Sequence, residues 1–289
     1  MSPASLADLK GLSEETVPLI LPVPARIFEK RSARLRFLAP GHPLGAYLEA
    51  MARLAEAQLA ASQAPSSGSW PASMSSPPFD LCESSRRGAW QKALDVIVSE
   101  MLLVPLPVPS HVTLSRLREV HPAELEDLAR SILSGNVDGI DRATSPFLSA
   151  ALQVYWTRLA SMVQPGVTEQ SAGGCPICAS PPVAGVVLSS RKLRYLCCSL
   201  CATLWYVPRL TCANCGSTAS ISYFTIDGDT NGTKAEACSQ CKTYLKLFYQ
   251  ESNPEAEAFA DDLATLALDL LMANQRYRRS GVNLFLLPE

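Results

Sequence analysis

Four short cysteine pairs constrain this chain more than any other feature of its sequence. Each pair is a C-x2-C motif, and the pairs are Cys175–Cys178, Cys198–Cys201, Cys212–Cys215 and Cys238–Cys241. A turn of this kind brings two thiolates to one ion while backbone amides donate hydrogen bonds to the sulfur atoms. A tetrahedral site closes with four such ligands, so the eight cysteines predict two metal sites.

The spacing between the pairs favours a sequential arrangement. The first two pairs are separated by 19 residues and the last two by 22 residues, which suits a hairpin between two metal-binding turns. An interleaved arrangement, known from cross-braced folds, would need gaps of 33 and 36 residues, and the sequence alone leaves it open. We therefore predict two sites with these ligands: site 1, Cys175, Cys178, Cys198 and Cys201; site 2, Cys212, Cys215, Cys238 and Cys241.

The remaining cysteines argue against two other classes of protein. Nine of the ten cysteines lie between residues 175 and 241, which excludes a uniformly disulfide-linked secreted protein. A thiol–disulfide oxidoreductase would need one exposed pair at a helix N-terminus, whereas these pairs flank predicted strands. Cys197 adjoins Cys198 and fits poorly into the same metal shell, so we interpret it as a spare thiol. Cys82 is interpreted as a lone cysteine.

Hydrophobic periodicity divides the chain into three parts of an α+β protein. A period of 3.6 residues predicts helices around residues 44–55, 90–102, 125–133 and 145–159, and again around residues 259–271. Short alternating runs predict strands at 183–188, 193–197, 203–207, 221–226, 233–237 and 244–249. We predict a helical domain at residues 1–170 with a mobile Ser/Pro loop at 62–80, a double metal-ribbon domain at 171–251, and a C-terminal helix and tail at 252–289.

Composition and termini favour a soluble cytoplasmic protein. The N-terminus has neither the basic nor the apolar region of a signal peptide, and no run approaches the roughly 18 apolar residues of a membrane span. We therefore expect no stable membrane insertion, and thiols that stay reduced in the cytoplasm hold metal more often than they form disulfides. No Ser/His/Asp order, phosphate-binding glycine loop or paired-carboxylate pattern appears, which points away from an enzyme.

Local charge bears on the metal sites and on nucleic acid binding. Residues 171–250 carry seven Lys/Arg and three Asp/Glu, a surplus of four that two four-thiolate sites with divalent ions would cancel. Arg191, Lys192, Arg194 and Arg209 are therefore expected to serve the thiolates. The net charge of −2 argues against nucleic acid as a partner. Aromatics such as Trp205 are expected to pack in the core rather than stack on bases.

The residues around the cysteines resemble a known family. The run CPICASPPVAGVV, then RYLCCSLCATLWYVPRLTCANCG, then CSQC and a C-terminal helix, is similar to the formate dehydrogenase accessory protein (FdhE) family. The stretches RIFEKRSARLRFLAPGHPLGAYLEAMARLAEAQ and ALQVYWTRLA resemble its helical domain, so the resemblance covers about residues 20–285. One departure is Cys197, where we associate the family with histidine; the four pairs stay intact.

The resemblance implies a function, a partner and a metal. It implies a cytoplasmic, non-enzymatic factor for the assembly of active respiratory formate dehydrogenase, which acts on the enzyme's catalytic subunit before export. It also implies a rubredoxin-like, iron-binding C-terminal domain, so we favour iron over zinc for the two ions, although only Cys215 is followed by the glycine usual in rubredoxin turns. A homo-oligomer is compatible with this interpretation.

Two other functions stay open at this point. One is an electron carrier of rubredoxin type, and the other is a nucleic-acid-binding zinc-ribbon protein.

The dense basic run of Arg26, Lys30, Arg31, Arg34 and Arg36 has two interpretations. It is either the solvated face of a helix or a docking surface for the client enzyme.

Overall fold

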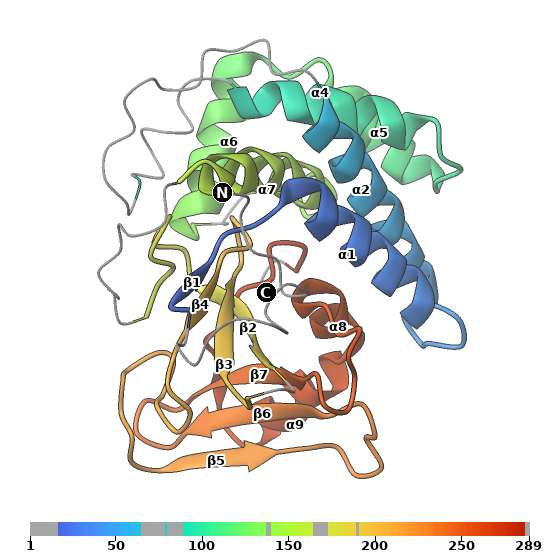
Figure 1. Ribbon diagram of the computed structural model, residues 1–289. Coiled ribbons are helices and arrows are strands. Elements are labelled where there is room, and N and C mark those ends of the chain that lie inside the picture. The colour runs from blue at the N-terminus through green and yellow to red at the C-terminus, as the bar shows by residue number, and fades with distance from the viewer. Residues whose placement is uncertain are drawn as a thin grey trace.

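The computed structural model describes residues 17–64, 79, 89–136, 140–163, 173–188 and 191–286. Helices gather at one end of the molecule and a β-sheet at the other, with two C-terminal helices beside the sheet (Figure 1). Most of the predicted Ser/Pro loop (residues 65–78 and 80) and Cys82 lie outside the described residues.

Six helices lie in the described residues of the N-terminal part. They are α1 (Pro24–Leu38), α2 (Gly45–Gln63), α4 (Ala89–Leu102), α5 (Val108–Leu117), α6 (Pro122–Ser134) and α7 (Ser145–Ser161). Helix α7 begins at Ser145, where the predicted helix 145–159 begins, and Pro146 lies in its first turn. Helix α6 is capped at its C-terminus by Gly135, which takes a left-handed φ of 73°. Helix α7 is buried along nearly its whole length and packs against α1, α2, α4 and α6.

The strands form one sheet. They are β1 (Leu19–Ile20), β2 (Pro182–Val187), β3 (Arg194–Cys198), β4 (Leu204–Tyr206), β5 (Ile221–Phe224), β6 (Thr233–Cys238), β7 (Thr243–Tyr249) and β8 (Arg278–Arg279). Their order is β1-β4-β3-β2-β7-β6-β5, with β8 also paired to β7. The six longer strands match the six predicted ones.

The sheet is two antiparallel three-stranded units joined edge to edge. The first unit is β2, β3 and β4, the second is β5, β6 and β7, and the parallel pairing of β2 with β7 connects them. Gly185 permits this junction, since a Cβ there would lie 2.5 Å from Leu247 Cδ2. The tandem architecture is therefore confirmed, with the two units fused into a single sheet.

The C-terminal segment is broken where one helix was predicted. Helix α8 (Ala258–Ala264) stops and α9 (Leu266–Asn274) starts around Thr265, whose φ is −117°. Lys246 Nζ donates to the carbonyls of Asp262 and Thr265, and Thr265 Oγ1 donates to the carbonyl of Asp261. These side chains occupy carbonyl oxygens that a continuous helix would use for its own hydrogen bonds, so the helix bends here.

The predicted boundaries at residues 170 and 251 stay predictions. Strand β1 comes from the N-terminal part yet pairs with β4 of the ribbon, and α8 packs on both α1 and β2. The main hydrophobic core likewise takes side chains from all three parts of the chain.

Candidate metal centres

The structure brings the eight paired cysteines together in two groups, as the sequential arrangement predicts. Cys175, Cys178, Cys198 and Cys201 form site 1, and Cys212, Cys215, Cys238 and Cys241 form site 2, with all sulfur atoms of a group within 4.8 Å of one another. In site 1 the first pair precedes β2 and the second follows from β3. Site 2 repeats this arrangement around β5 and β6.

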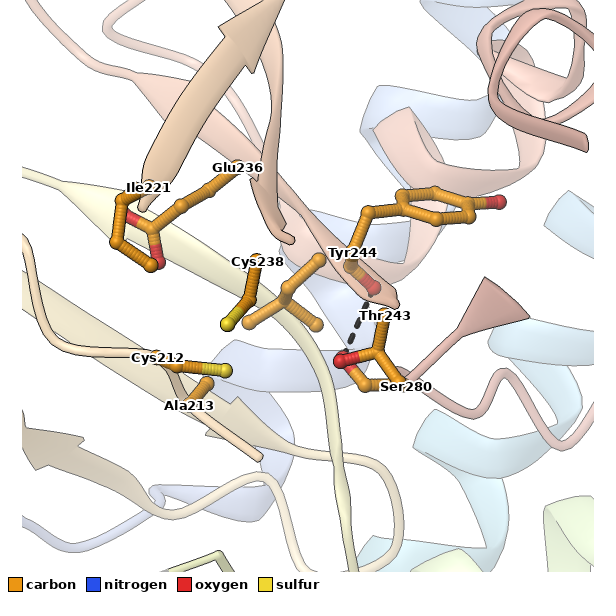
Figure 2. A pocket seen from close by; sticks show the side chains of 9 residues that line it. Cys212, Ala213, Ile221, Glu236, Cys238, Thr243, Tyr244 and Ser280 are labelled. Carbon is orange, nitrogen blue, oxygen red and sulfur yellow. Dashed lines mark hydrogen bonds between the residues drawn. The ribbon is translucent and has the colours of Figure 1, made fainter. Parts of the chain in front are cut away.

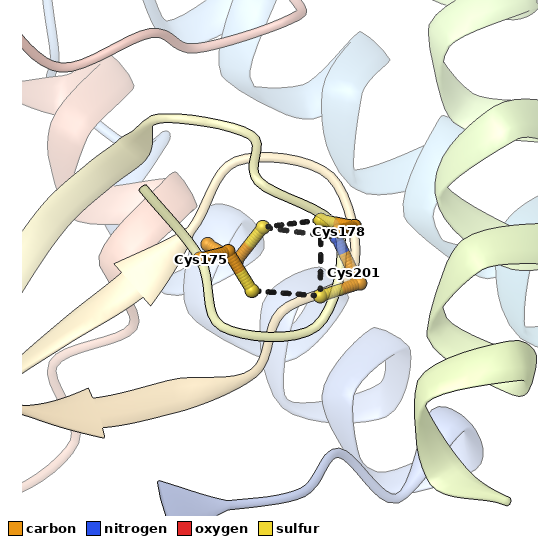
Figure 3. A group of neighbouring side chains, drawn as sticks. Cys175, Cys178 and Cys201 are labelled. Carbon is orange, nitrogen blue, oxygen red and sulfur yellow. Dashed lines mark hydrogen bonds between the residues drawn. The ribbon is translucent and has the colours of Figure 1, made fainter. Parts of the chain in front are cut away.

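The sulfur–sulfur distances fit a shared ion. Three distances in site 1 are 3.4, 3.5 and 3.6 Å, and two in site 2 are 3.7 and 3.8 Å. A tetrahedral ion with metal–sulfur bonds of about 2.3 Å would place its sulfur atoms roughly 3.8 Å apart, whereas a disulfide bond is about 2.05 Å long. The two four-cysteine clusters could therefore hold two metal ions. Figure 3 shows sulfur atoms of site 1 turned toward one another.

The backbone of each turn supports this chemistry. In site 1 the amides of Ile177 and Leu200 donate to the first cysteine of their pair, and in site 2 the amide of Asn214 does the same, each at 3.4 Å. Such bonds stabilise a thiolate, the form that binds metal.

The residue after each second cysteine has a left-handed backbone. These residues are Ala179, Ala202, Gly216 and Lys242, with φ of 59°, 57°, 72° and 57°. The turn therefore keeps the conformation that favours glycine even where alanine or lysine occupies it, at a conformational cost of about 1 kcal/mol. The missing glycines do not disrupt the metal-binding turns.

A hydroxyl group follows at the next position in every turn, a repeat that was not predicted from the sequence. Thr203 Oγ1 lies 3.1 Å from Cys201 Sγ, and Thr243 Oγ1 lies 3.0 Å from Cys241 Sγ. Ser180 and Ser217 hold the equivalent places, and their carbonyls accept hydrogen bonds from the amides of Cys175 and Cys212. The signal was present in the sequence as C-x-x-C-x-[ST] in all four turns.

The thiols of each cluster cannot all ionise without a cation. In site 1 burial opposes ionisation, yet hydrogen bonds from the neighbouring thiols and Ser180 lower the pKa of Cys178 well below its usual value. Burial, followed by hydrogen bonds with Cys175 and Cys178, raises the pKa values of Cys198 and Cys201 well above the usual range. In site 2 burial also opposes ionisation, but Thr243 is the first of several partners that lower the pKa of Cys241 to about 6. In site 1 the thiolate of Cys178 is thus stabilised while Cys198 and Cys201 stay protonated, and a bound divalent ion would remove that conflict.

The two sites differ sharply in exposure. All four cysteines of site 1 are buried, and the middle residues of its turns, Ile177 and Leu200, belong to the main hydrophobic core together with the helices. In site 2 Cys215 is exposed and Cys241 is half-buried. The corresponding middle residues there, Asn214 and Gln240, are polar and exposed. Site 1 is therefore part of the interior and site 2 faces solvent.

A small cavity lies behind site 2. Its lining includes Cys212 and Cys238 together with Glu236, Thr243 and Ser280 (Figure 2). It has room for about one water molecule. This cavity is too small for an organic substrate.

Several sequence expectations about charge are wrong. Arg194 does not serve the thiolates: it is buried, pairs with Glu236, and donates to the carbonyls of Pro208 and Thr211. Lys192 pairs on the surface with Glu251. The basic run on α1 is neither a fully solvated face nor an open docking surface, because Arg31 and Arg34 are buried and contact acidic residues of the C-terminal segment.

The other candidate residues take part in core packing or in hydrogen bonds that hold the fold together. Cys197 is buried in a second hydrophobic cluster, where burial raises its pKa. His42 bonds the carbonyl of Ala264 through Nε2, and His121 caps α6. Trp205 is buried in the main core, in agreement with the expectation of core packing.

The fold and the two four-cysteine clusters define a tandem ribbon protein whose sheet adjoins a group of helices at one end (Figure 1). Comparison with known proteins gives the family. Three models match in succession: "FdhE, N-terminal" over residues 16–172, "FdhE, central domain" over 174–209 and "FdhE, C-terminal domain" over 210–286. The chain belongs to the FdhE family.

Named relatives agree along nearly the whole chain. Protein FdhE of Escherichia coli strain K12 is 36% identical over 96% of this chain and 94% of its own. The FdhE homolog of Serratia proteamaculans is 38% identical with the same coverage. The crystal structure of the FdhE protein from Pseudomonas aeruginosa matches with a TM-score of 0.86 at 34% identity, over 94% of this chain and 99% of that one. No helix in the described ranges combines the length and apolar content that a membrane span requires.

Proposed function

We propose that this protein is a non-enzymatic accessory factor for the maturation of respiratory formate dehydrogenase, and that it binds the catalytic subunit of that enzyme in the cytoplasm. The observation that carries the proposal is the match to all three FdhE segments along one chain that also keeps both four-cysteine clusters.

The two clusters hold one metal ion each in this proposal. Site 1 uses Cys175, Cys178, Cys198 and Cys201, and site 2 uses Cys212, Cys215, Cys238 and Cys241. Four thiolates suit both iron and zinc, and the resemblance to the FdhE family, which implies a rubredoxin-like C-terminal domain, favours iron. Bound metal would cross-link the two turns of each cluster and so hold them in a fixed arrangement. It could also supply one-electron redox chemistry if the ion is iron.

The residues around the two sites suggest a structural role for site 1 and a client-binding role for site 2. The turns of site 1 insert Ile177 and Leu200 into the helical core, so this site ties the helices to the sheet. The turns of site 2 present Cys215, Asn214 and Gln240 to solvent. A client can reach site 2 without disturbing the core, so we place client contact on this face of the ribbon.

An anaerobic affinity purification tests the proposal. Tagged protein from formate-grown cells should retain the formate dehydrogenase catalytic subunit, and metal analysis of the same sample should give about two ions per chain, mainly iron. Cys215→Ser removes a ligand of the exposed site and should reduce client recovery. Cys197→Ala alters a cysteine outside both clusters and is the matched control. Recovery of the catalytic subunit at background level by the unmodified protein would refute the role in maturation.

Electron transfer is a second candidate function, favoured by one observation. The exposure of Cys215 would bring the ion of site 2 close to the surface, which short-range electron transfer requires. An iron-loaded protein whose visible absorbance is bleached and restored by successive reduction and oxidation would support this candidate. Zinc as the only metal in the anaerobic sample would exclude it.

A further inference from the structure

Gln153 of α7 is a buried junction between site 1 and three helices. Its Nε2 donates to the carbonyl of Ser199 at 2.9 Å. Its Oε1 accepts from Arg31 Nη1 of α1 and from Gln58 Nε2 of α2, both at 3.0 Å. All four residues are almost completely buried, so each of these bonds replaces a contact with water that the interior cannot offer.

The junction extends to the C-terminal segment through Arg31. The Nε atom of Arg31 lies 3.5 Å from a carboxylate oxygen of Glu257, and its guanidinium stacks 3.8 Å from the ring centroid of Phe259. The other carboxylate oxygen of Glu257 accepts from the amides of Phe259 and Ala260 and so caps α8. A continuous set of polar contacts therefore runs from the site 1 turn through α7 and α1 to α8.

The contact with Ser199 depends on the shape of the metal-binding turn. Ser199 lies between the ligands Cys198 and Cys201, and the next two amides in the turn donate to Cys198 Sγ. While those amides point at the sulfur, the carbonyl of Ser199 points outward to Gln153. An ion that fixes Cys198 and Cys201 therefore also fixes the direction of the carbonyl that Gln153 binds. An empty site 1 would free the turn, and with it the position of Gln153.

We propose that Gln153 is a positioning residue that couples metal binding at site 1 to the packing of α1 and α8. Helices α1 and α8 then pack as the structure shows only when site 1 holds its metal ion. The inference rests on the proposed metal binding at site 1 and adds a regulatory consequence to it. Coupling of this kind is reciprocal, so a change at Gln153 must also change how tightly site 1 holds its metal. Site 2 is the internal control, since the middle residues of its turns, Asn214 and Gln240, are exposed rather than packed on the helices.

The decisive variant is Gln153→Glu in the full-length protein reconstituted with zinc. A glutamate keeps an acceptor for Arg31 and Gln58 but has no amide to donate to Ser199. The readout is the rate of zinc transfer to a coloured chelator, which should have a fast phase from site 2 and a slow phase from site 1. We expect Gln153→Glu to accelerate the slow phase about ten-fold, as loss of one buried hydrogen bond would, and to leave the fast phase within about two-fold.

Hydrogen exchange provides the reciprocal measurement. In the unmodified protein, zinc should protect residues 24–38 and 258–264 against exchange, and in Gln153→Glu this metal-dependent protection should be lost. Gln275→Glu changes an exposed glutamine in the same way and is the matched control. Arg31→Lys keeps a positive charge beside Glu257 but removes the bond to Gln153, so it should accelerate the slow phase even if Gln153→Glu fails to fold.

Different outcomes separate this inference from the proposed function. An unchanged slow phase in both variants, or equal acceleration of both phases, would overturn the coupling while leaving metal binding intact. Failure of the unmodified protein to hold any zinc would instead refute the proposed metal binding itself. Client recovery is measured separately and enters neither result.

Discussion

Arg34 and Asp261, which are 227 residues apart in the sequence, form a bidentate ion pair. Arg34 Nη2 lies 2.6 Å from one carboxylate oxygen and Nε lies 3.0 Å from the other. Each side chain is only 6% exposed, and the carboxylate also accepts from the amide of Glu257 at 2.7 Å. The pair thus anchors α8 to α1 beside the contact between Arg31 and Glu257.

Removal of one partner should strongly destabilise the fold, because the other charge then stays buried without a counter-charge. We expect Arg34→Met to lower the free energy of unfolding by about 3–5 kcal/mol, measured by denaturant titration of the metal-loaded protein. Arg53→Met breaks only the surface pairs of Arg53 with Glu49 and Glu56 and should cost less than about 1 kcal/mol.

The double variant Arg34→Met/Asp261→Leu gives a second check. Both charges are then absent, so much of the lost stability should return. The single variants Arg34→Met and Asp261→Leu are measured alongside it. If the double variant loses as much free energy of unfolding as the two single variants together, the ion pair is not the source of the effect.

The ribbon was largely predictable from the sequence, because its signals are local. The four C-x2-C motifs, their spacing and the alternating runs between them predict the two clusters and six strands that the structure contains. The unequal burial of the sites also had a local signal, since Ile177 and Leu200 are apolar where Asn214 and Gln240 are polar.

The burial of charge on α1 was not predictable in the same way. Arg31 and Arg34 resemble a solvated basic face until Glu257 and Asp261, more than 220 residues later, are known to pack against them. Gln153 likewise lies on a helix predicted only from its apolar stripe, and its partners come from α1, α2 and the ribbon. Such contacts are set by the tertiary arrangement and leave no periodic pattern.

Tyr47 should make stability fall in alkaline solution. Burial raises its pKa to about 12, and its hydroxyl donates to the carbonyl of Phe285 at 2.9 Å. In the unfolded chain the phenol ionises near pH 10, so the stabilisation is complete below pH 10 and is lost as the pH rises toward 12.

The variant Tyr47→Phe isolates this effect. At pH 8 it should be less stable than the unmodified protein by about 1 kcal/mol, the value of one hydrogen bond. By pH 11 that difference should shrink by about 1 kcal/mol, because only the unmodified chain carries the ionisable phenol. Parallel stability curves for the two proteins between pH 8 and pH 11 would contradict the assignment.

Replacement of Lys242 by glycine should stabilise the folded protein. Its φ of 57° is unfavourable for any residue with a Cβ, and its side chain is exposed. Its one described side-chain contact is the placement of Nζ 5.5 Å from the ring centroid of Tyr277. We expect Lys242→Gly to raise the free energy of unfolding by about 0.5–1 kcal/mol, measured by thermal or denaturant unfolding. Lys242→Ala loses the same contact but keeps the Cβ, so it should give no gain.

The unequal burial of the two clusters should appear as two rates of metal loss. Chelator can reach site 2 through exposed Cys215 and half-buried Cys241, whereas all ligands of site 1 lie in the core. Under chelator challenge at neutral pH, one ion per chain should leave quickly and the other on the slower timescale of local unfolding.

Ligand variants assign the two phases of metal loss. Cys215→Ser should abolish the fast phase and leave the helical content nearly unchanged by circular dichroism. Cys178→Ser should destabilise the whole fold, because it leaves a polar hydroxyl and three unmatched thiols in the interior. Simultaneous loss of both ions from the unmodified protein would mean that the exposed site cannot open independently of the core.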